Sequence, residues 1–300
     1  MVDKIDPYRS RCDDTPRIID RLNPVVYGKT TQTGDAPLTR EQIDFYEANG
    51  FLHLENIFSA DEVWAFHDEL IRLRTAAELQ GMTEVILEPD GTAIRSIFAI
   101  HQTNPLFNRL SRDPRLVGVV SFLLGSPVYI HQSRINYKPG FEGKEFYWHS
   151  DFETWHMEDG MPRMRAISCS IALSENNKFN GPLMVIPGSH KLYVVCVGQT
   201  PANHYLSSLQ KQEYGVPAPE MLEKLVERGG IAAPKGPAGS VTFFESNMMH
   251  GSNSNITPWP RHNIFIVYNS VENQLVAPFC GLKPRPEFIA SREFTPVEPL

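Results

Sequence analysis

The chain has 300 residues, of which 41% are hydrophobic and 21% are charged, and its formal net charge is −7. This composition is typical of a globular protein that buries a large core, and it excludes disordered and fibrous classes. A mildly acidic chain is poorly suited to binding nucleic acid or an anionic membrane through bulk electrostatics. A local basic pocket for an acidic small molecule remains compatible with this charge.

The sequence has no run of about 18 apolar residues, which argues against a membrane span. Its N-terminus, "MVDKIDPYRSRCDD", lacks the apolar segment of a secretory signal. The four cysteines lie far apart and form no CxxC motif: Cys12, Cys169, Cys196 and Cys280. This spacing excludes a cysteine-rich zinc site, and we expect reduced thiols and a cytoplasmic location.

The first part of the chain predicts an irregular arm followed by a mainly helical scaffold. Residues 1–37 are polar and interrupted by proline and glycine. Within residues 38–125, Thr39 with Gln42 and Ser59 with Glu62 form capping boxes that predict helices ending near residues 50 and 81. The segment "FLHLENIF" between them predicts a short strand, and residues 105–124 predict two short helices that separate near residue 114.

Residues 126–290 predict a β core. Short segments rich in β-branched and aromatic residues recur there, bounded by turn residues: "PVYIHQSRINYKP", "RAISCSIALS", "PLMVIPGS", "GSVTFFES" and "HNIFIVYNSV". Residues 198–238 interrupt them with a proline-rich, partly helical insertion. Strands after a helical first third favour a sandwich or jelly roll with helices packed outside. No linker divides the chain, so we expect one domain over residues 1–300.

The segment "FYWHSDFETWH" (146–156) concentrates ionisable groups among aromatic ones. If it were helical, His149, Glu153 and His156 would share a face and resemble a zinc site. If it were extended, His149 and Asp151 would point the same way, because strand side chains alternate. Its many aromatic residues favour the extended geometry, in which the first histidine and the aspartate could hold one ion.

A third ligand is needed, and His250 is the best candidate because it follows the predicted strand "GSVTFFES". An HxD motif with a distant histidine forms the two-histidine, one-carboxylate facial triad of non-haem Fe(II) sites, which leaves open positions for substrates. The alternative is a chance HxD motif and a hydrogen-bonded core histidine.

Arg261 lies eleven residues after His250, at the start of the next predicted strand. A hairpin of that length would return Arg261 to the metal. A guanidinium inside a barrel favours bidentate pairing with a carboxylate, so Arg261 could clamp an organic diacid that chelates iron at its other end. The alternative is an exposed arginine at a strand end.

Together, these motifs resemble the Fe(II)- and 2-oxoglutarate-dependent dioxygenases of the phytanoyl-CoA hydroxylase-like superfamily. The segments "HQSRINYKPGF", "WHSDFETWHMEDGMPRMRAISCS", "NNKFNGPLMVIPGSHK", "KQEYG" and "HGSNSNITPWPRHNIFIVYNS" resemble its ectoine hydroxylases from about residue 40 onward. The resemblance implies a double-stranded β-helix with flanking helices, a homodimer, and iron held by His149, Asp151 and His250. It also implies O2 and 2-oxoglutarate as cosubstrates.

The resemblance further implies a set of ligand contacts. It places 2-oxoglutarate beside Arg261, Ser252, Asn136 and Phe146. It places ectoine, a zwitterion with a delocalised cationic ring, beside Gln132, Trp155, Thr154 and Arg285. Physical chemistry agrees, because an indole face attracts a cation, a guanidinium pairs with a carboxylate and an amide bonds ring nitrogens. The alternatives are a core tryptophan, a solvated loop arginine and a strand-surface glutamine.

Several other ionisable residues are expected to be structural or to support the site without contacting ligands: Glu153, His156, Glu158 and Asp159. His190 and His262 are expected to be turn or packing residues. The reaction implied is hydroxylation of ectoine to 5-hydroxyectoine with release of succinate and CO2, as part of an osmotic stress response. The alternatives are a dioxygenase acting on another small amino or imino acid such as proline, and a non-catalytic cupin-like binding protein.

Overall fold

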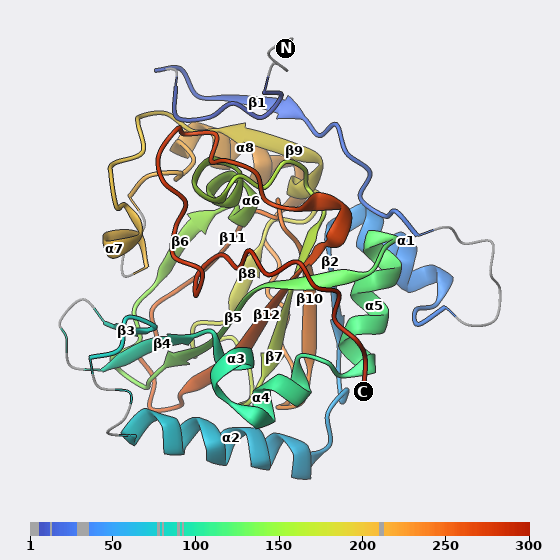
Figure 1. Cartoon of the computed structure of the whole chain (residues 1–300), viewed down its shortest axis with the longest axis vertical. Helices are drawn as coiled ribbons and strands as arrows, with labels where there is room; N and C mark the ends of the chain where they lie inside the picture. Colours follow the sequence, from blue (N-terminus) through green and yellow to red (C-terminus); the bar gives the residue numbers. More distant parts are fainter. Residues whose placement is uncertain are drawn as a thin grey trace.

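The computed structural model describes residues 6–12, 14–28, 36–76, 79, 81–88, 91, 93–209 and 213–300. Its centre is a large antiparallel sheet whose strands lie in the order β2 (Phe51–Leu54), β10 (Val241–Glu245), β7 (Ala166–Ala172), β12 (Arg261–Ser270), β5 (Val128–Lys138), β4 (Ile94–Phe98) and β3 (Val85–Leu87). A smaller antiparallel sheet has the order β6 (Phe146–His149), β11 (His250–Ser252) and β8 (Leu183–Val185). Figure 1 shows both sheets at the middle of the molecule.

Apolar side chains from both sheets pack into one cluster, so the sheets form the two layers of a jelly roll. Phe51, Phe244 and Phe265 come from the large sheet, and Leu183 and Val185 come from the small one. Burial of such side chains is the main stabilising contribution to the fold, at roughly 25 cal/mol per Å² of apolar surface. The expected fold class, a mainly β jelly roll with flanking helices, is confirmed.

Helices cover the outer face of the large sheet. They are α1 (Arg40–Asn49), α2 (Ala60–Thr75), α3 (Ile100–Thr103), α4 (Pro105–Leu110) and α5 (Pro114–Leu124). Their buried side chains share one cluster with the outward side chains of the sheet, for example Leu70 with Ile135 and Ile264. In Figure 1, α2 runs below the sheets and α5 runs beside them.

The remaining helical elements all follow β6 in the chain. They are α6 (Asp151–Thr154), the π-helix η2 (Trp155–Asp159), the 3-10 helices η3 (Ser189–Lys191) and η4 (Val271–Asn273), α7 (Tyr205–Ser208), and α8 (Pro219–Gly229). The apolar face of α8 packs on Ile186 and Val194. None of the described helices is long and apolar enough to cross a membrane.

Most local predictions are confirmed. Both capping boxes are present, the first helix ends at Gly50 with φ 80°, and α4 and α5 separate before Pro114. The end of α2 was predicted wrongly: the helix ends at Thr75, because Ala76 takes an extended conformation. Residues 77, 78 and 80, which that prediction also covered, lie outside the described residues.

The arm was also expected to be irregular, but part of it is a strand. β1 (Arg17–Asp20) pairs antiparallel with β9 (Leu192–Val195), and its two isoleucines supply the β-branched side chains that such pairing favours. The strands β3 and β4 fall in the region that was expected to be mainly helical. β4 pairs with β5 and thereby brings its side chains to the inside of the roll.

A bulge in β5 determines which of its side chains face inward. Opposite β12, Val267 pairs with Gln132 and Tyr268 pairs with Ile130, so His131 has no partner residue across the ladder. The extra residue breaks the alternation, and His131 and Gln132 both face the interior of the roll. Bulges often redirect side chains beside active sites in this way.

Candidate active site

Three side chains at the junction of β6 and β11 could hold a metal ion. One ligand atom from each of His149, Asp151 and His250 lies within 4.8 Å of the other two. Nε2 of His149 lies 3.7 Å from Oδ1 of Asp151, and Nε2 of His250 lies 3.9 Å from Oδ2. Strand pairing sets this geometry, because His250 stands directly opposite His149 across the ladder.

Backbone carbonyls orient both imidazoles toward the centre of this cluster. Nδ1 of His149 donates to the Tyr147 carbonyl at 2.7 Å, and Nδ1 of His250 donates to the Met248 carbonyl at 2.9 Å. A carbonyl can only accept, so each Nδ1 carries a proton, and Nε2 is the atom of each ring left to bind a metal. Burial and the neighbouring His250 lower the pKa of His149 to about 4, which keeps that imidazole neutral. The donor set therefore fits a divalent transition metal such as Fe(II).

The expected extended geometry of this segment is wrong after His149. The strand ends there, Ser150 caps the next turn by accepting a hydrogen bond from the Glu153 amide, and Asp151 is the first residue of α6. The pattern S-x-x-E at 150–153 is a helix-start signature, and it outweighs the strand preference of the aromatic residues. As a result, Glu153 faces away from the metal cluster and bonds Ser10 and Arg11 instead.

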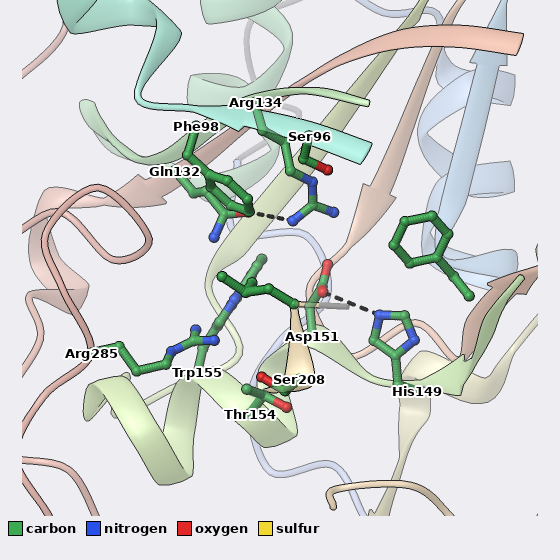
Figure 2. A pocket seen from close by; sticks show the side chains of 12 residues that line it. Ser96, Phe98, Gln132, Arg134, His149, Asp151, Thr154, Trp155, Ser208 and Arg285 are labelled. Atoms are coloured by element: carbon green, nitrogen blue, oxygen red, sulfur yellow. Dashed lines mark hydrogen bonds and ion pairs between the residues drawn. The ribbon is translucent and has the colours of Figure 1, made fainter. Parts of the chain in front are cut away.

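An open pocket adjoins the metal cluster. Figure 2 shows Ser96, Gln132 and Arg134 on one side of it, and Trp155 and Arg285 on another. The pocket is lined by Ser96, Phe98, Gln132, Arg134, Phe146, His149, Asp151, Thr154, Trp155, Ser208, Leu209 and Arg285. All four of the residues expected beside the substrate, Gln132, Thr154, Trp155 and Arg285, therefore line one cavity with two metal-cluster residues.

One side of the site, the Arg261 end, comprises Arg261, Lys138, Ser252, Phe146 and Asn136. Across the ladders Ser252 is opposite Phe146, and Arg261 is opposite Lys138. Nζ of Lys138 donates to Oγ of Ser252 at 2.8 Å and lies 5.5 Å from the ring centre of Phe146. Phe146 lines the open pocket, and Asn136 accepts a hydrogen bond from the pocket residue Ser96 at 2.8 Å. These contacts join the Arg261 end to the pocket.

The Arg261 guanidinium is buried and weakly paired. Among the described residues, this guanidinium makes one hydrogen bond, from Nη1 to Oδ1 of Asn263 at 3.3 Å, and its Nε has no partner. Burial lowers the pKa of Arg261 to about 10. A buried cation with unused donors is costly unless an anion meets it. The Arg261 end therefore fits an anionic ligand.

The opposite side, the Arg285 end, comprises Arg285, Asp159, Trp155, Thr154 and His131. Nε and Nη2 of Arg285 donate to the two carboxylate oxygens of Asp159 at 2.7 and 2.6 Å. The Trp155 ring packs edge-on against His131, with 4.9 Å between centres. Trp155 is also part of an apolar cluster with Phe152, so it is both a core residue and a pocket wall.

Gln132 lies beside the Arg285 end with both polar atoms engaged. Its amide nitrogen donates to the Ile289 carbonyl at 2.7 Å, and its Oε1 accepts from Nη1 of Arg134 at 2.5 Å. These two hydrogen bonds hold the Gln132 amide in one orientation. One lone pair of Oε1 remains for a ligand N–H.

A buried ion network supports the π-helix from behind. Arg11, in the N-terminal arm, bonds Glu153 through Nε and Nη2 and bonds Glu158 through Nη1. Glu158 also bonds His204, and the His156 ring bonds Asp6. The carboxylates outweigh the effect of burial and raise the pKa of Arg11. These contacts agree with the expected supporting role of Glu153, His156 and Glu158.

His190 and His262 are packing residues, as expected. Both are buried; His190 bonds the Glu47 carbonyl, and His262 packs against the Tyr137 ring. The four cysteines are free.

Sequence reasoning missed several residues of the site. Gln132 and Asn136 were named, but Arg134 and Lys138 share their face of β5 and were not. Period-two alternation from the named residues would have found both. Ser96 and Phe98 were missed because β4 was not predicted, and Ser208 and Leu209 follow from tertiary packing alone.

The comparisons with known proteins agree with this geometry. The phytanoyl-CoA dioxygenase (PhyH) family matches residues 46–263. A protein from Bordetella bronchiseptica named ectoine dioxygenase is 57% identical over 98% of this chain and 96% of its own length. One of the same name from Stutzerimonas stutzeri is 55% identical over 98% of this chain and 97% of its own.

Solved structures of EctD from S. alaskensis have the same fold. The apoform superposes with a TM-score of 0.88 at 48% identity, covering 98% of both chains. A structure with 2-oxoglutarate and 5-hydroxyectoine has a TM-score of 0.87 at 49% identity, covering 98% of this chain and 96% of that one. A third, with bound Fe, has a TM-score of 0.86 at 46% identity, covering 98% of both chains. The chain belongs to the phytanoyl-CoA dioxygenase family.

Proposed function

We propose that this protein is an Fe(II)- and 2-oxoglutarate-dependent dioxygenase that converts ectoine, 2-oxoglutarate and O2 into 5-hydroxyectoine, succinate and CO2. The observation that carries the proposal is the near full-length similarity to a structure that holds 2-oxoglutarate and 5-hydroxyectoine. The metal cluster beside an open pocket supports it independently.

In this proposal His149, Asp151 and His250 are the ligands of the iron. Bound Fe(II) would supply the activation of dioxygen that couples oxidation of the keto acid to hydroxylation of a C–H bond. The three residues contribute two imidazoles and one carboxylate, and their ligand atoms lie within 4.8 Å of one another. Three ligands on one face leave positions open for the other reactants.

The Arg261 end is proposed to hold 2-oxoglutarate. The carboxylate of 2-oxoglutarate that lies far from the metal would accept hydrogen bonds from the unused donors of Arg261, with Ser252 and Asn136 beside it. Phe146 would wall the chain of the keto acid. The protein fixes the position of the cosubstrate in this way, and positioning of reactants is a large part of catalysis.

The Arg285 end is proposed to hold ectoine. The face of Trp155 would attract the delocalised cationic ring, and Nη1 of Arg285, which Asp159 leaves unused, would bond the carboxylate. Gln132 would accept from a ring N–H, and Thr154 would lie close by. Each group orients the ring so that one carbon faces the metal cluster.

We also propose that residues 1–300 form a single catalytic domain of a cytoplasmic homodimer. The free cysteines and the absence of a membrane-spanning helix among the described residues are compatible with the location. Light scattering on the purified protein tests the dimer, and a mass of one chain would refute it.

The test of function is anaerobic reconstitution with Fe(II), followed by 2-oxoglutarate, ectoine and air, with mass spectrometry of the products. We expect ectoine to gain one oxygen atom and succinate to form in equal amount. Succinate without hydroxyectoine would refute ectoine as substrate, and proline would be tested next. Neither product, from protein that holds iron, would refute the dioxygenase and favour a non-catalytic binding protein.

A further inference from the structure

The two ends of the site bury cations with different compensation. At and near the Arg261 end, the basic side chains Arg261, Lys138 and Arg134 bond only neutral oxygens within the described chain. Those acceptors are Asn263 Oδ1 at 3.3 Å, Ser252 Oγ at 2.8 Å with the Asn253 carbonyl at 2.6 Å, and Gln132 Oε1 at 2.5 Å. None of these three basic side chains has an ion pair with a carboxylate in the described residues, where the buried pairs include those of Arg11, Arg95 and Arg285 instead.

The Arg285 end, in contrast, is electrically balanced. The carboxylate of Asp159 takes both Nε and Nη2 of Arg285, and the two side chains are buried together. His131 lies 3.6 Å from the same carboxylate, and burial together with Arg285 and Arg292 lowers its pKa to about 3, so it adds no charge. Behind the pair, Arg11 is balanced by Glu153 and Glu158.

The side-on pairing also limits how Arg285 can meet a ligand. A guanidinium has two edges that can bind a carboxylate with two parallel hydrogen bonds, and Asp159 occupies the Nε/Nη2 edge of Arg285. Nη1 and the second hydrogen of Nη2 remain. A ligand carboxylate would therefore meet the Nη1/Nη2 edge of Arg285, whose charge Asp159 already compensates.

We propose that Asp159 is the specificity-determining residue that makes the Arg285 end select a zwitterion and reject an anion. It acts through Arg285, as a positioning residue that does not touch the substrate. This inference rests on the proposed function, and it assigns to Asp159 a role in choosing between the two organic reactants, which both carry carboxylates.

The physical reason is charge balance between buried side chains. A zwitterion brings no net charge, so it suits a balanced wall, where its ring faces Trp155 and its carboxylate meets Nη1 of Arg285. A dicarboxylate brings two negative charges, and with Asp159 in place the guanidinium of Arg285 offers it no uncompensated positive charge. Without that discrimination, 2-oxoglutarate could occupy the substrate position and block turnover.

The first test counts dicarboxylate sites in Asp159→Asn, which keeps the shape of the side chain and removes its charge. Calorimetric titration with 2-oxoglutarate, on Fe(II)-loaded protein under nitrogen, should give one site per chain in the wild type and two in the variant. In turnover, the variant should show inhibition by excess 2-oxoglutarate that rising ectoine relieves, at a concentration about tenfold or more below any seen with the wild type. One site and unchanged inhibition in a folded variant would overturn the proposal.

The double variant Asp159→Asn with Arg285→Gln separates charge from packing. It restores the neutral balance, so the second dicarboxylate site should disappear. If the second site persisted, disrupted packing would explain it and the proposal would be overturned. The binding count needs no ectoine, so it stands even if the wild type fails to hydroxylate ectoine, and the two failures are distinguishable.

Arg285→Gln alone provides a test should Asp159→Asn fail to fold. It leaves the charge of Asp159 uncompensated, so the Arg285 end should now prefer a cation. The carboxamide of ectoine keeps the ring cation and lacks the carboxylate. The ratio of KM values should move toward the carboxamide by about tenfold or more, and a ratio equal to that of the wild type would overturn the proposal.

Discussion

The Arg261 end and the Arg285 end each bury an arginine beside the same pocket, and the two residues are 4% and 9% exposed. Within the described part of the chain, the Arg261 guanidinium has one long hydrogen bond and an unpartnered Nε, whereas Arg285 has a two-point ion pair with Asp159. Both residues are arginines, so the difference in their protein partners determines whether each guanidinium can bind an anionic ligand. An unpaired buried guanidinium is prepared for an anion, and a paired one is a rigid, neutral wall.

The difference also has a cost in stability. Burying a charge without a partner opposes folding, and the rest of the jelly roll must offset that cost. The stabilisation that offsets this cost comes from the apolar clusters on both faces of the large sheet. Natural sequences tolerate such local conflicts mainly at functional sites.

The largest expected effect comes from the metal cluster, which lies between the two ends. Asp151→Ala removes the one carboxylate of the cluster, so iron binding and turnover should both fall, turnover by on the order of 10³-fold or more. Iron content and succinate formation measure this. Asp44→Ala, at an exposed position of α1, is the matched control and should keep both. Full turnover of Asp151→Ala with iron would refute the ligand assignment.

The ion network behind the Arg285 end is the next strongest contribution. Arg11→Gln leaves Glu153 and Glu158 without their buried cation, which should lower the free energy of unfolding by about 3 kcal/mol. Urea denaturation measures the change. Arg40→Gln disrupts an exposed pair with Asp44 and should cost less than about 0.5 kcal/mol. Equal effects from the two variants would contradict a supporting role for the network.

Proton uptake on ligand binding should distinguish the Arg261 end from the Arg285 end. Burial and the nearby Arg261 and Arg95 lower the pKa of Lys138 to about 6, so at pH 8 this side chain is mostly neutral. A bound dicarboxylate favours the ammonium form. Binding of 2-oxoglutarate at pH 8 should therefore take up a proton and weaken as pH rises, by up to about tenfold per pH unit.

Calorimetry in buffers of different ionisation enthalpy measures that uptake. Lys138→Met should abolish it, because the apolar side chain cannot titrate. Binding of ectoine should take up no proton in either protein, because the Arg285 end is already balanced. An uptake with 2-oxoglutarate that persists in Lys138→Met would assign it to another group.

The smallest effect concerns the aromatic wall of the Arg285 end. Trp155→Leu keeps an apolar side chain and removes the ring face, so KM for ectoine should rise about 5- to 30-fold, as expected for losing a desolvated cation–π contact. KM for 2-oxoglutarate should not change. Trp259→Leu, at a residue 56% exposed, is the control and should behave as the wild type. A rise in both KM values would indicate general loss of packing.

Local signals in the sequence were enough to predict much of this structure. Capping boxes located α1 and α2, and β-branched runs located the main strands, because these signals act over a few neighbouring residues. The metal cluster was predicted from HxD and a distant histidine, and the structure brings all three residues together. That prediction succeeded because two histidines and one carboxylate are a ligand set suited to one kind of metal site.

What could not be predicted depends on long-range packing. The bulge that turns His131 inward and the pairing of Arg11 with Glu153 both join segments far apart in the chain. The partner of Arg285 was also out of reach, since Asp159 stands 126 positions away. The turn at Asp151 was missed for a different reason. The helix cap at Ser150 is a local signal that can be read from the sequence, but the prediction gave more weight to the aromatic residues around it.

The most direct test of the two-ended pocket is the set of four KM values from Arg261→Gln and Arg285→Gln, each measured for 2-oxoglutarate and for ectoine. Arg261→Gln should raise KM for 2-oxoglutarate by about a hundredfold and leave that for ectoine within about threefold. Arg285→Gln should raise KM for ectoine and leave that for 2-oxoglutarate unchanged. If both variants raised both values equally, the two arginines would serve one shared site and the account would be contradicted.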